Sequence, residues 1–241
     1  MKIKLLGIVF VLAAFVAAGN AQSVVVTGKK VTYNRPKPFS EYKKTFTINY
    51  PKVKAATPAL SKKIETAISY EKVLGLNLKD ELNDTQWIEE ADYKVKYNRK
   101  GVLCVELSME GSGAYPSSVS KMVVVDIRMG SKSRPADVFI NLAGLTALVR
   151  KAQEKERQDT IARIKKEEPD ADEPEILFGS RRFIGSDLDG YELSAKGVIF
   201  HYDYAFPHVA VIYEPAGAFF YTWTQLKPYI KAGGLLSRMK R

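Results

Sequence analysis

Cysteine, histidine and tryptophan are scarce in this sequence: one, two and two among 241 residues. A single cysteine, Cys104, excludes an internal disulfide. It lies in the apolar stretch 102–105, which predicts a buried thiol that packs as a small hydrophobe. The sequence contains no HExxH, GxSxG or CxxC motif. We therefore predict no catalytic residues, no metal site and no cofactor.

Long apolar runs are also absent beyond the first 21 residues. Lys2 and Lys4 precede an uncharged apolar run, 5–18, which is shorter than the roughly 20 residues of a membrane span. Gly19 and Ala21 are small residues at the positions read by a signal peptidase, so residues 1–21 are predicted to be a cleaved signal peptide. The sequence has no cysteine near the cleavage site, so a lipid anchor is not expected. We expect an exported chain, periplasmic or extracellular, with no transmembrane segment after cleavage.

Acidic residues are outnumbered, 27 against 37 lysines and arginines. Removing Lys2 and Lys4 leaves 35 basic and 27 acidic side chains, a net charge of +8. Such a surface favours anionic partners such as wall polymers, acidic glycans or lipid headgroups. Nucleic acid is disfavoured by the predicted compartment. The alternative is that the charge serves only solubility.

Residue periodicity predicts strands and helices in alternation through the first two thirds of the chain. Residues 22–41 are expected to form an extended arm, and 42–50 a half-buried strand that Pro51 ends. Thr57 and Pro58 suit the cap and first position of a helix that ends near Gly75. The later segments are two strands joined by a turn, an apolar central strand and a long helix, at 92–97, 102–109, 119–129 and 142–168.

The last third returns to strands, expected at 198–204, 208–213 and 219–222. A short helix follows at 224–232, and Pro228 should either kink it or end it early. The expected fold class is α+β: an antiparallel sheet meander packed against a long helix and shorter helices. Residues 197–230 hold 10 of the 26 aromatic residues. Most should build the core, and an exposed subset could stack on sugars or anchor a partner.

Five residues of this last third are candidates for binding. His201 and Asp203 share the strand face opposite the aromatic residues, and His208 follows nearby. Trp223 is the first candidate for an exposed anchor, with Tyr221 beside it. The simpler interpretation puts the aromatic residues in the core and His201 and Asp203 in solvent. An uncharacterised hydrolase centred on His201, Asp203 and His208 stays a further alternative.

Several short segments resemble a known family of exported modules. The segments are 197–204 (GVIFHYDY), 208–213, 214–217 (EPAG) and 225–230 (QLKPYI), preceded by 114–116, 126–130 and 137–139. They are similar to the C-terminal module of RsiV-type anti-sigma factors, which also occurs in the non-catalytic front region of some peptidoglycan deacetylases. The resemblance covers about 114–232 and divides the chain into an N-terminal α+β part (42–113), an RsiV-like module (114–233) and a basic tail (234–241).

The resemblance implies a binding module rather than an enzyme. In the anti-sigma factors the module recognises lysozyme, and in the deacetylases it lies beside a wall-modifying enzyme. In this sequence we expect neither the sigma-binding segment nor the deacetylase domain of those proteins. The leading hypothesis is a non-enzymatic cell-envelope module that binds peptidoglycan or another anionic wall polymer. The alternative is an inhibitor or sensor of a lysozyme-like protein, which the net positive charge disfavours unless an acidic patch such as 170–175 offsets it.

Overall fold

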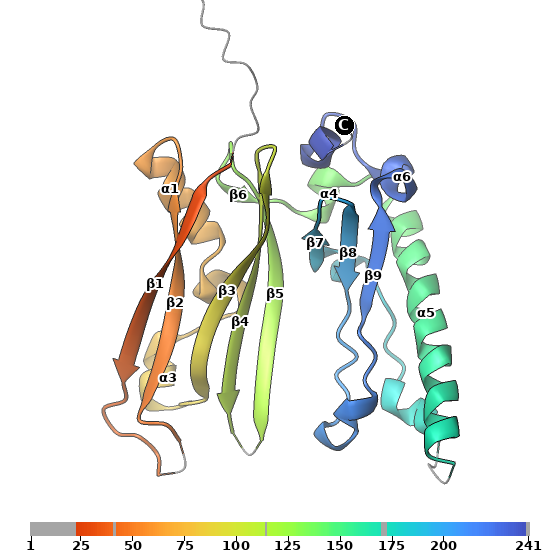
Figure 1. Cartoon of the computed structure of the whole chain (residues 1–241), viewed down its shortest axis with the longest axis horizontal. Helices are drawn as coiled ribbons and strands as arrows, with labels where there is room; N and C mark the ends of the chain where they lie inside the picture. The colour runs from red at the N-terminus through yellow and green to blue at the C-terminus, as the bar shows by residue number, and fades with distance from the viewer. Residues whose placement is uncertain (1–22, 41, 114, 170–172, 240–241) are drawn as a thin grey trace, which may run out of the picture.

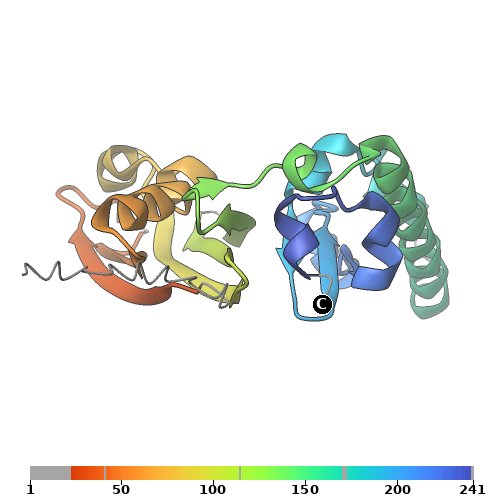
Figure 2. The same ribbon diagram turned by 90° about the horizontal axis from the view of Figure 1, so that it is seen from above.

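A computed structural model describes residues 23–40, 42–113, 115–169 and 173–239, so the predicted signal peptide lies outside the described residues. Two parts lie side by side (Figure 1). The first is a six-stranded sheet with three short helices on one face, and the second is a three-stranded sheet with a long helix beside it. Seen from above, a single connecting segment runs from one part to the other (Figure 2).

The large sheet follows the order of the sequence. Its strands are β1 (Val25–Asn34), β2 (Thr45–Lys54), β3 (Ile88–Arg99), β4 (Val102–Ser112), β5 (Pro116–Asp126) and β6 (Ser131–Lys132). Every neighbouring pair is antiparallel except β2 and β3, which are parallel over Thr47 and Ile48. The predicted α+β class and the β3–β4–β5 meander are confirmed.

The extended arm expected at 22–41 was a wrong prediction, because most of it is strand β1. This strand pairs with β2 along its whole length, yet most of its side chains are exposed. Backbone hydrogen bonds to β2 hold β1 in the sheet. Because its side chains are mostly exposed, the sequence of β1 lacks the alternation of apolar and polar residues that marks a half-buried strand. Pro51 also does not end β2. It lies beyond Ile48, where β2 pairs with β1 alone, and such one-sided positions tolerate proline.

Helices α1 (Pro58–Ala67), α2 (Tyr70–Val73) and α3 (Leu78–Asn83) connect β2 to β3. The predicted start is confirmed, since the Thr57 hydroxyl accepts a hydrogen bond from the Leu60 N–H at 3.2 Å. The single helix expected as far as Gly75 is divided at Ser69, which caps α2. Buried side chains such as Ile64 and Ile68 pack these helices onto one face of the sheet.

The second part begins with α4 (Pro135–Val138) and α5 (Leu142–Glu167), and the predicted long helix is confirmed. Its remaining elements are η1 (Pro174–Phe178), η2 (Gly185–Asp189), β7 (Tyr191–Leu193), β8 (Gly197–His201), η3 (His208–Tyr213), β9 (Ala218–Thr222), α6 (Trp223–Leu226), η4 (Lys227–Tyr229) and η5 (Leu235–Met239). β8 is the middle strand and is antiparallel to both neighbours.

Two local predictions in this part were wrong. The strand expected at 208–213 is the 3-10 turn η3, in which Val209 is 90% exposed, so its apolar residues do not share a buried face. The β8 strand ends at His201, three residues earlier than expected. The terminal helix ends early, as one of the two expectations for Pro228 had it: α6 ends at Leu226, and Pro228 lies in the 3-10 turn η4 that follows.

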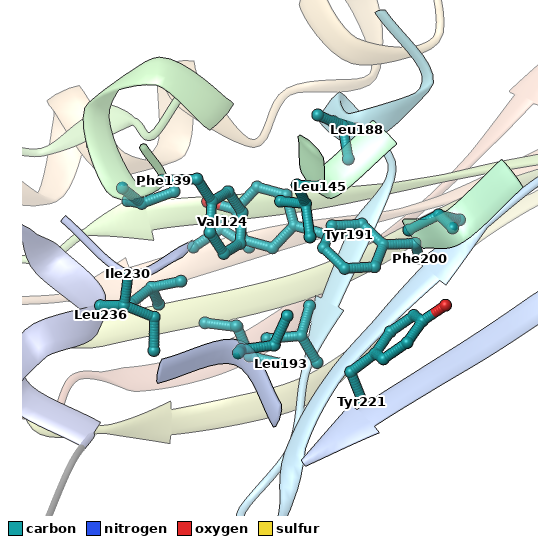
Figure 3. Close-up of a cluster of buried hydrophobic side chains, with 14 of the residues drawn as sticks. Val124, Phe139, Leu145, Leu188, Tyr191, Leu193, Phe200, Tyr221, Ile230 and Leu236 are labelled. Carbon is teal, nitrogen blue, oxygen red and sulfur yellow. The ribbon is translucent and has the colours of Figure 1, made fainter. Parts of the chain in front are cut away.

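Two hydrophobic cores meet at the large sheet. One lies between the sheet and α1–α3, and includes Val123 and Val125 of β5. The other fills the second part and also takes in Val102, Cys104 and Val124 from the opposite face of the sheet. Figure 3 shows Val124 in the same cluster as Phe139 and Tyr191. Cys104 is fully buried, as predicted.

Strand β5 is apolar on both faces because it separates these two cores, but it is not a central strand as expected. β6 covers only Val125 and Asp126, and the rest of β5 forms the edge of the sheet. The sheet thus continues past the predicted boundary at 113–114, and the division into modules stays a prediction. In the described segments, no helix has both the length and the apolar character needed to cross a bilayer.

Candidate binding groove

A groove of about 1560 Å³ lies between the two parts and is lined by residues of both. Its floor is the exposed length of β5. One wall is formed by α1 and α2, and the other by the segments around η2 and after β8. We call this cavity the junction groove. Each of the two parts supplies one wall of this groove.

The floor of the junction groove is a strand edge with free backbone groups. Residues 118–122 of β5 line it consecutively. The Ser133 N–H donates to the Val124 carbonyl at 2.7 Å, so the backbone of Val124 faces the open side rather than β4. Because backbone direction alternates along a strand, Met122, Ser120 and Ser118 also direct their N–H and C=O groups into the groove.

The helical wall is rich in lysine. Ala59, Lys62, Lys63 and Thr66 line the groove at positions i, i+3, i+4 and i+7, which share one face of α1. Lys72 of α2 and Lys121 of β5 extend the same wall. None of these four lysines lies within ion-pair distance of a carboxylate in the described part of the chain. We call Lys62, Lys63, Lys72 and Lys121 the lysine wall.

The opposite wall holds both paired charges and two carboxylates, Asp203 and Glu214, that lie outside the described ion pairs. The Arg181 guanidinium lies 3.4 Å from an Asp187 carboxylate oxygen, and Lys132 at the groove's edge pairs with Asp189. The groove lining holds six basic and five acidic side chains, and four of the six basic ones form the lysine wall, so positive charge is concentrated on that side. An uncompensated row of ammonium groups beside a cavity attracts anions.

A network of ion pairs joins the two parts at one end of the groove. Lys96 of β3 lies 3.5 Å from Glu106 and 3.3 Å from Glu192, and Glu192 in turn lies 3.1 Å from His201 Nε2. Glu192 is only 8% exposed. Burial opposes the charge of Lys96, but the carboxylates of Glu192 and Glu106 outweigh it and raise the pKa of Lys96.

A ring contact joins the two parts at the other end. Tyr115, beside the β4–β5 turn, stacks on His208 of η3 with ring centroids 4.6 Å apart. Figure 1 shows the β4–β5 turn and η3 at the same end of the molecule. The groove thus lies between a partly buried network of charged side chains and an exposed aromatic contact.

The predicted binding residues have different positions. His201 and Asp203 line the groove, and His208 flanks it, while Tyr202 between the first two is buried as expected. Asp203 accepts a hydrogen bond from the Ala205 N–H at 2.8 Å. These three side chains thus have separate partners.

Tyr221 and Trp223 lie away from the groove lining. Tyr221 is in the core, and its hydroxyl donates to the Leu148 carbonyl at 3.2 Å. Trp223 is partly buried, and its Nε1 donates to the Ala195 carbonyl at 3.1 Å. A binding role for the five residues stays a prediction.

Sequence reasoning missed the lysine wall and the open edge of β5. The helical spacing of Lys62 and Lys63 with Ala59 and Thr66 was a visible signal, but nothing in the pattern placed this face beside β5. Among the residues that the structure describes, no group of three or more histidine, cysteine or acidic side chains is arranged to hold a metal ion.

The fold is shared with solved structures. A DUF3298 family member from Bacteroides fragilis is 12% identical, with a TM-score of 0.56, and the match covers 92% of this chain and 98% of that one. A DUF3298 family protein from Pseudomonas aeruginosa is 15% identical, with a TM-score of 0.53 and coverages of 87% and 94%. These are proteins of a domain of unknown function, and the likeness is one of fold. No family model and no curated protein matches the sequence.

Proposed function

We propose that the protein is an exported, non-enzymatic binding module of the cell envelope, and that the junction groove binds an anionic wall polymer such as peptidoglycan or another wall glycan. The lysine wall is the observation that carries this proposal. Its four ammonium groups face an open cavity without a described acidic partner. A polymer with regularly spaced carboxylates or phosphates supplies the missing charge.

The size of the groove supports a chain rather than a small molecule as the ligand. Its volume of about 1560 Å³ exceeds the roughly 300–1,000 Å³ of typical small-molecule pockets. Both parts contribute walls, so a bound polymer contacts both and is buried more deeply than on a flat surface. The predicted export of the chain would bring the groove to the wall.

The resemblance to RsiV-type modules also raised a lysozyme-like partner. The charge of the groove disfavours it, because a basic enzyme is repelled by the lysine wall at long range. The acidic segment suggested as an offset, 170–175, lies partly outside the described residues. Lysozyme therefore enters the test below as a competing partner.

Co-sedimentation with purified peptidoglycan tests the proposal. The chain from Gln22 onwards is compared with a groove variant, Lys62→Glu with Lys72→Glu, at low and high salt. We expect the parent protein to pellet at low salt and the groove variant to bind at least tenfold more weakly, since four units of charge change beside the ligand.

The matched control carries the same change of charge elsewhere. Lys29→Glu with Lys54→Glu alters two exposed lysines on β1 and β2, away from the groove lining. Equal loss of binding in both variants would reduce the effect to net charge and contradict a site in the groove. Pelleting only after lysozyme is bound to the wall would favour the protein partner.

A further inference from the structure

We infer that the open edge of β5 is a strand-addition site, at which an extended polypeptide with acidic side chains at every second position pairs with residues 117–123. This goes beyond the proposed function, because it assigns a second class of ligand to the groove. It does not depend on wall binding, since it rests on backbone groups that a glycan does not need.

The backbone of β5 has unpaired polar groups on the side of the groove in the described part of the chain. Ser118, Ser120 and Met122 direct N–H and C=O groups into the groove, and no described group bonds to them there. The open stretch of seven residues is about 23 Å long at ~3.3 Å per residue. An unpaired edge of this length is a ready template for another strand.

The chain itself leaves this edge open. After β5 it turns through Gly130, whose φ is +69°, and pairs back only over Ser131 and Lys132. A Cβ on Gly130 would lie 2.7 Å from the Cβ of Lys63, so the turn is pressed against α1. The chain then crosses to α4 in the second part, and β6 cannot extend along β5.

The walls of the groove determine the side-chain pattern of the guest. Val119 and Lys121 of β5 face the helical side, together with Lys62, Lys63 and Lys72. Ser118, Ser120 and Met122 face the other side. An added strand alternates in the same way, so acidic residues at every second position meet the lysine wall and the residues between them meet the serines.

The charge complementarity commits the site to an acidic extended polypeptide. A lysine on an edge strand discourages pairing with other strands. Lys121 lies beside three further lysines of the lysine wall, so pairing is favourable only for a strand whose acidic side chains offset their charge. The lysine wall selects the peptide by its charge, and the edge of β5 binds the backbone of the same peptide.

A fluorescein-labelled peptide of five Glu-Thr repeats is the probe, and binding to the chain from Gln22 onwards is followed by fluorescence anisotropy. Two N-methylated forms are compared, one methylated at every Glu and one at every Thr. In an added strand, alternate N–H groups face β5 and the others face away. We expect one form to bind at least tenfold more weakly and the other to stay within about threefold of the parent peptide. Equal binding by both forms, or equal loss, would overturn the inference.

A variant pair tests the protein side. Ser120→Pro removes an N–H that faces the groove and leaves the bonds to β4 in place, whereas Ser120→Ala keeps the backbone donor. We expect at least a tenfold loss of peptide binding for Ser120→Pro and less than twofold for Ser120→Ala. Equal binding by two folded variants would contradict strand addition.

The two proposals can fail separately. If Ser120→Pro is not folded in a thermal unfolding assay, the methylated peptides with the parent protein decide. Peptidoglycan held by side chains alone should still bind to a folded Ser120→Pro variant, so loss of peptide with retention of wall supports strand addition. If the two methylated peptides bind equally and soluble wall fragments displace both, the groove binds the glycan and the peptide does not pair with β5.

Discussion

The outer face of the β4–β5 hairpin is closed at one end and open at the other. At the closed end, Val102, Cys104 and Val124 are buried against the second part. At the open end the same face of β5 carries Ser118 and Ser120, both exposed, beside the junction groove. The same pair of strands thus holds the two parts together where its side chains are apolar and leaves room for a ligand where they are small and polar.

Side-chain polarity explains why the groove stays open at one end. Burial of apolar surface stabilises the closed end at about 25 cal/mol per Å². Serine offers little apolar surface and loses hydration when buried, so the second part gains nothing by closing over Ser118 and Ser120. The tests that follow separate the two ends.

The largest expected effect is at the closed end. Leu193 of β7 is fully buried in the core that includes Cys104 and Val124. Replacing it with alanine removes buried methyl groups and leaves a cavity, so Leu193→Ala should lower the free energy of unfolding by about 2–5 kcal/mol. Urea denaturation measures this change. Ser118→Ala at the open end is the control and should stay within about 0.5 kcal/mol of the parent. Similar losses in both would show that the two ends are not distinct.

A second effect depends on pH. Burial raises the pKa of the Cys104 thiol to about 12. In the unfolded chain the thiol ionises near its ordinary pKa of 9.0, while the folded thiol stays neutral. Its contribution to stability is therefore complete below pH 9 and is lost as the pH rises towards 12. We expect the parent to lose about 2 kcal/mol more than Cys104→Ala between pH 8 and 10.5.

Paired urea titrations at the two pH values measure this difference, and the buried tyrosines contribute equally to both proteins. Identical pH slopes would mean that the closed end admits water to the thiol. Reaction of Cys104 with a thiol reagent in the folded protein would lead to the same conclusion.

The smallest effect is expected where the closed end meets the groove. Lys96 holds Glu106 and the buried Glu192 together, so Lys96→Met leaves Glu192 with His201 as its remaining side-chain partner in these contacts. We expect a loss of about 1 kcal/mol, because the three side chains are partly screened by solvent. Denaturation at low and at high salt measures it. The control, Lys94→Met on the same strand, changes a lysine outside the described ion pairs and should have less effect. Equal losses of stability in both variants would show that the ion pairs of Lys96 do not join the two parts specifically.

Much of the fold could be predicted from local sequence patterns. Thr57 and Pro58 mark the start of α1 because caps are local signals, and α5 follows from its periodicity. Strand β1 was missed because its exposed faces lack an apolar period, and η3 because consecutive apolar residues after Pro207 resemble a strand. In both cases tertiary context, rather than local pattern, determines the structure.

The groove was beyond prediction for another reason. Lys62, Ser120 and His201 are far apart in the sequence and meet only through the strand order of the large sheet and the crossing to α4. Periodicity shows that β5 is a strand, but it does not show which neighbour is missing. The candidates His201 and Asp203 do line the groove, because alternation in and after β8 turned them away from the aromatic core.

Amide hydrogen exchange across residues 117–123 measures whether the edge of β5 is open to a further strand. In the free protein we expect fast exchange at Ser118, Ser120 and Met122, whose N–H groups face the groove, and slow exchange at Val119, Lys121 and Val123, whose N–H groups bond to β4. The Glu-Thr peptide should slow the three fast amides and leave the others unchanged. Uniform protection of all six amides in the free protein would mean that the edge is already covered, and would contradict the account.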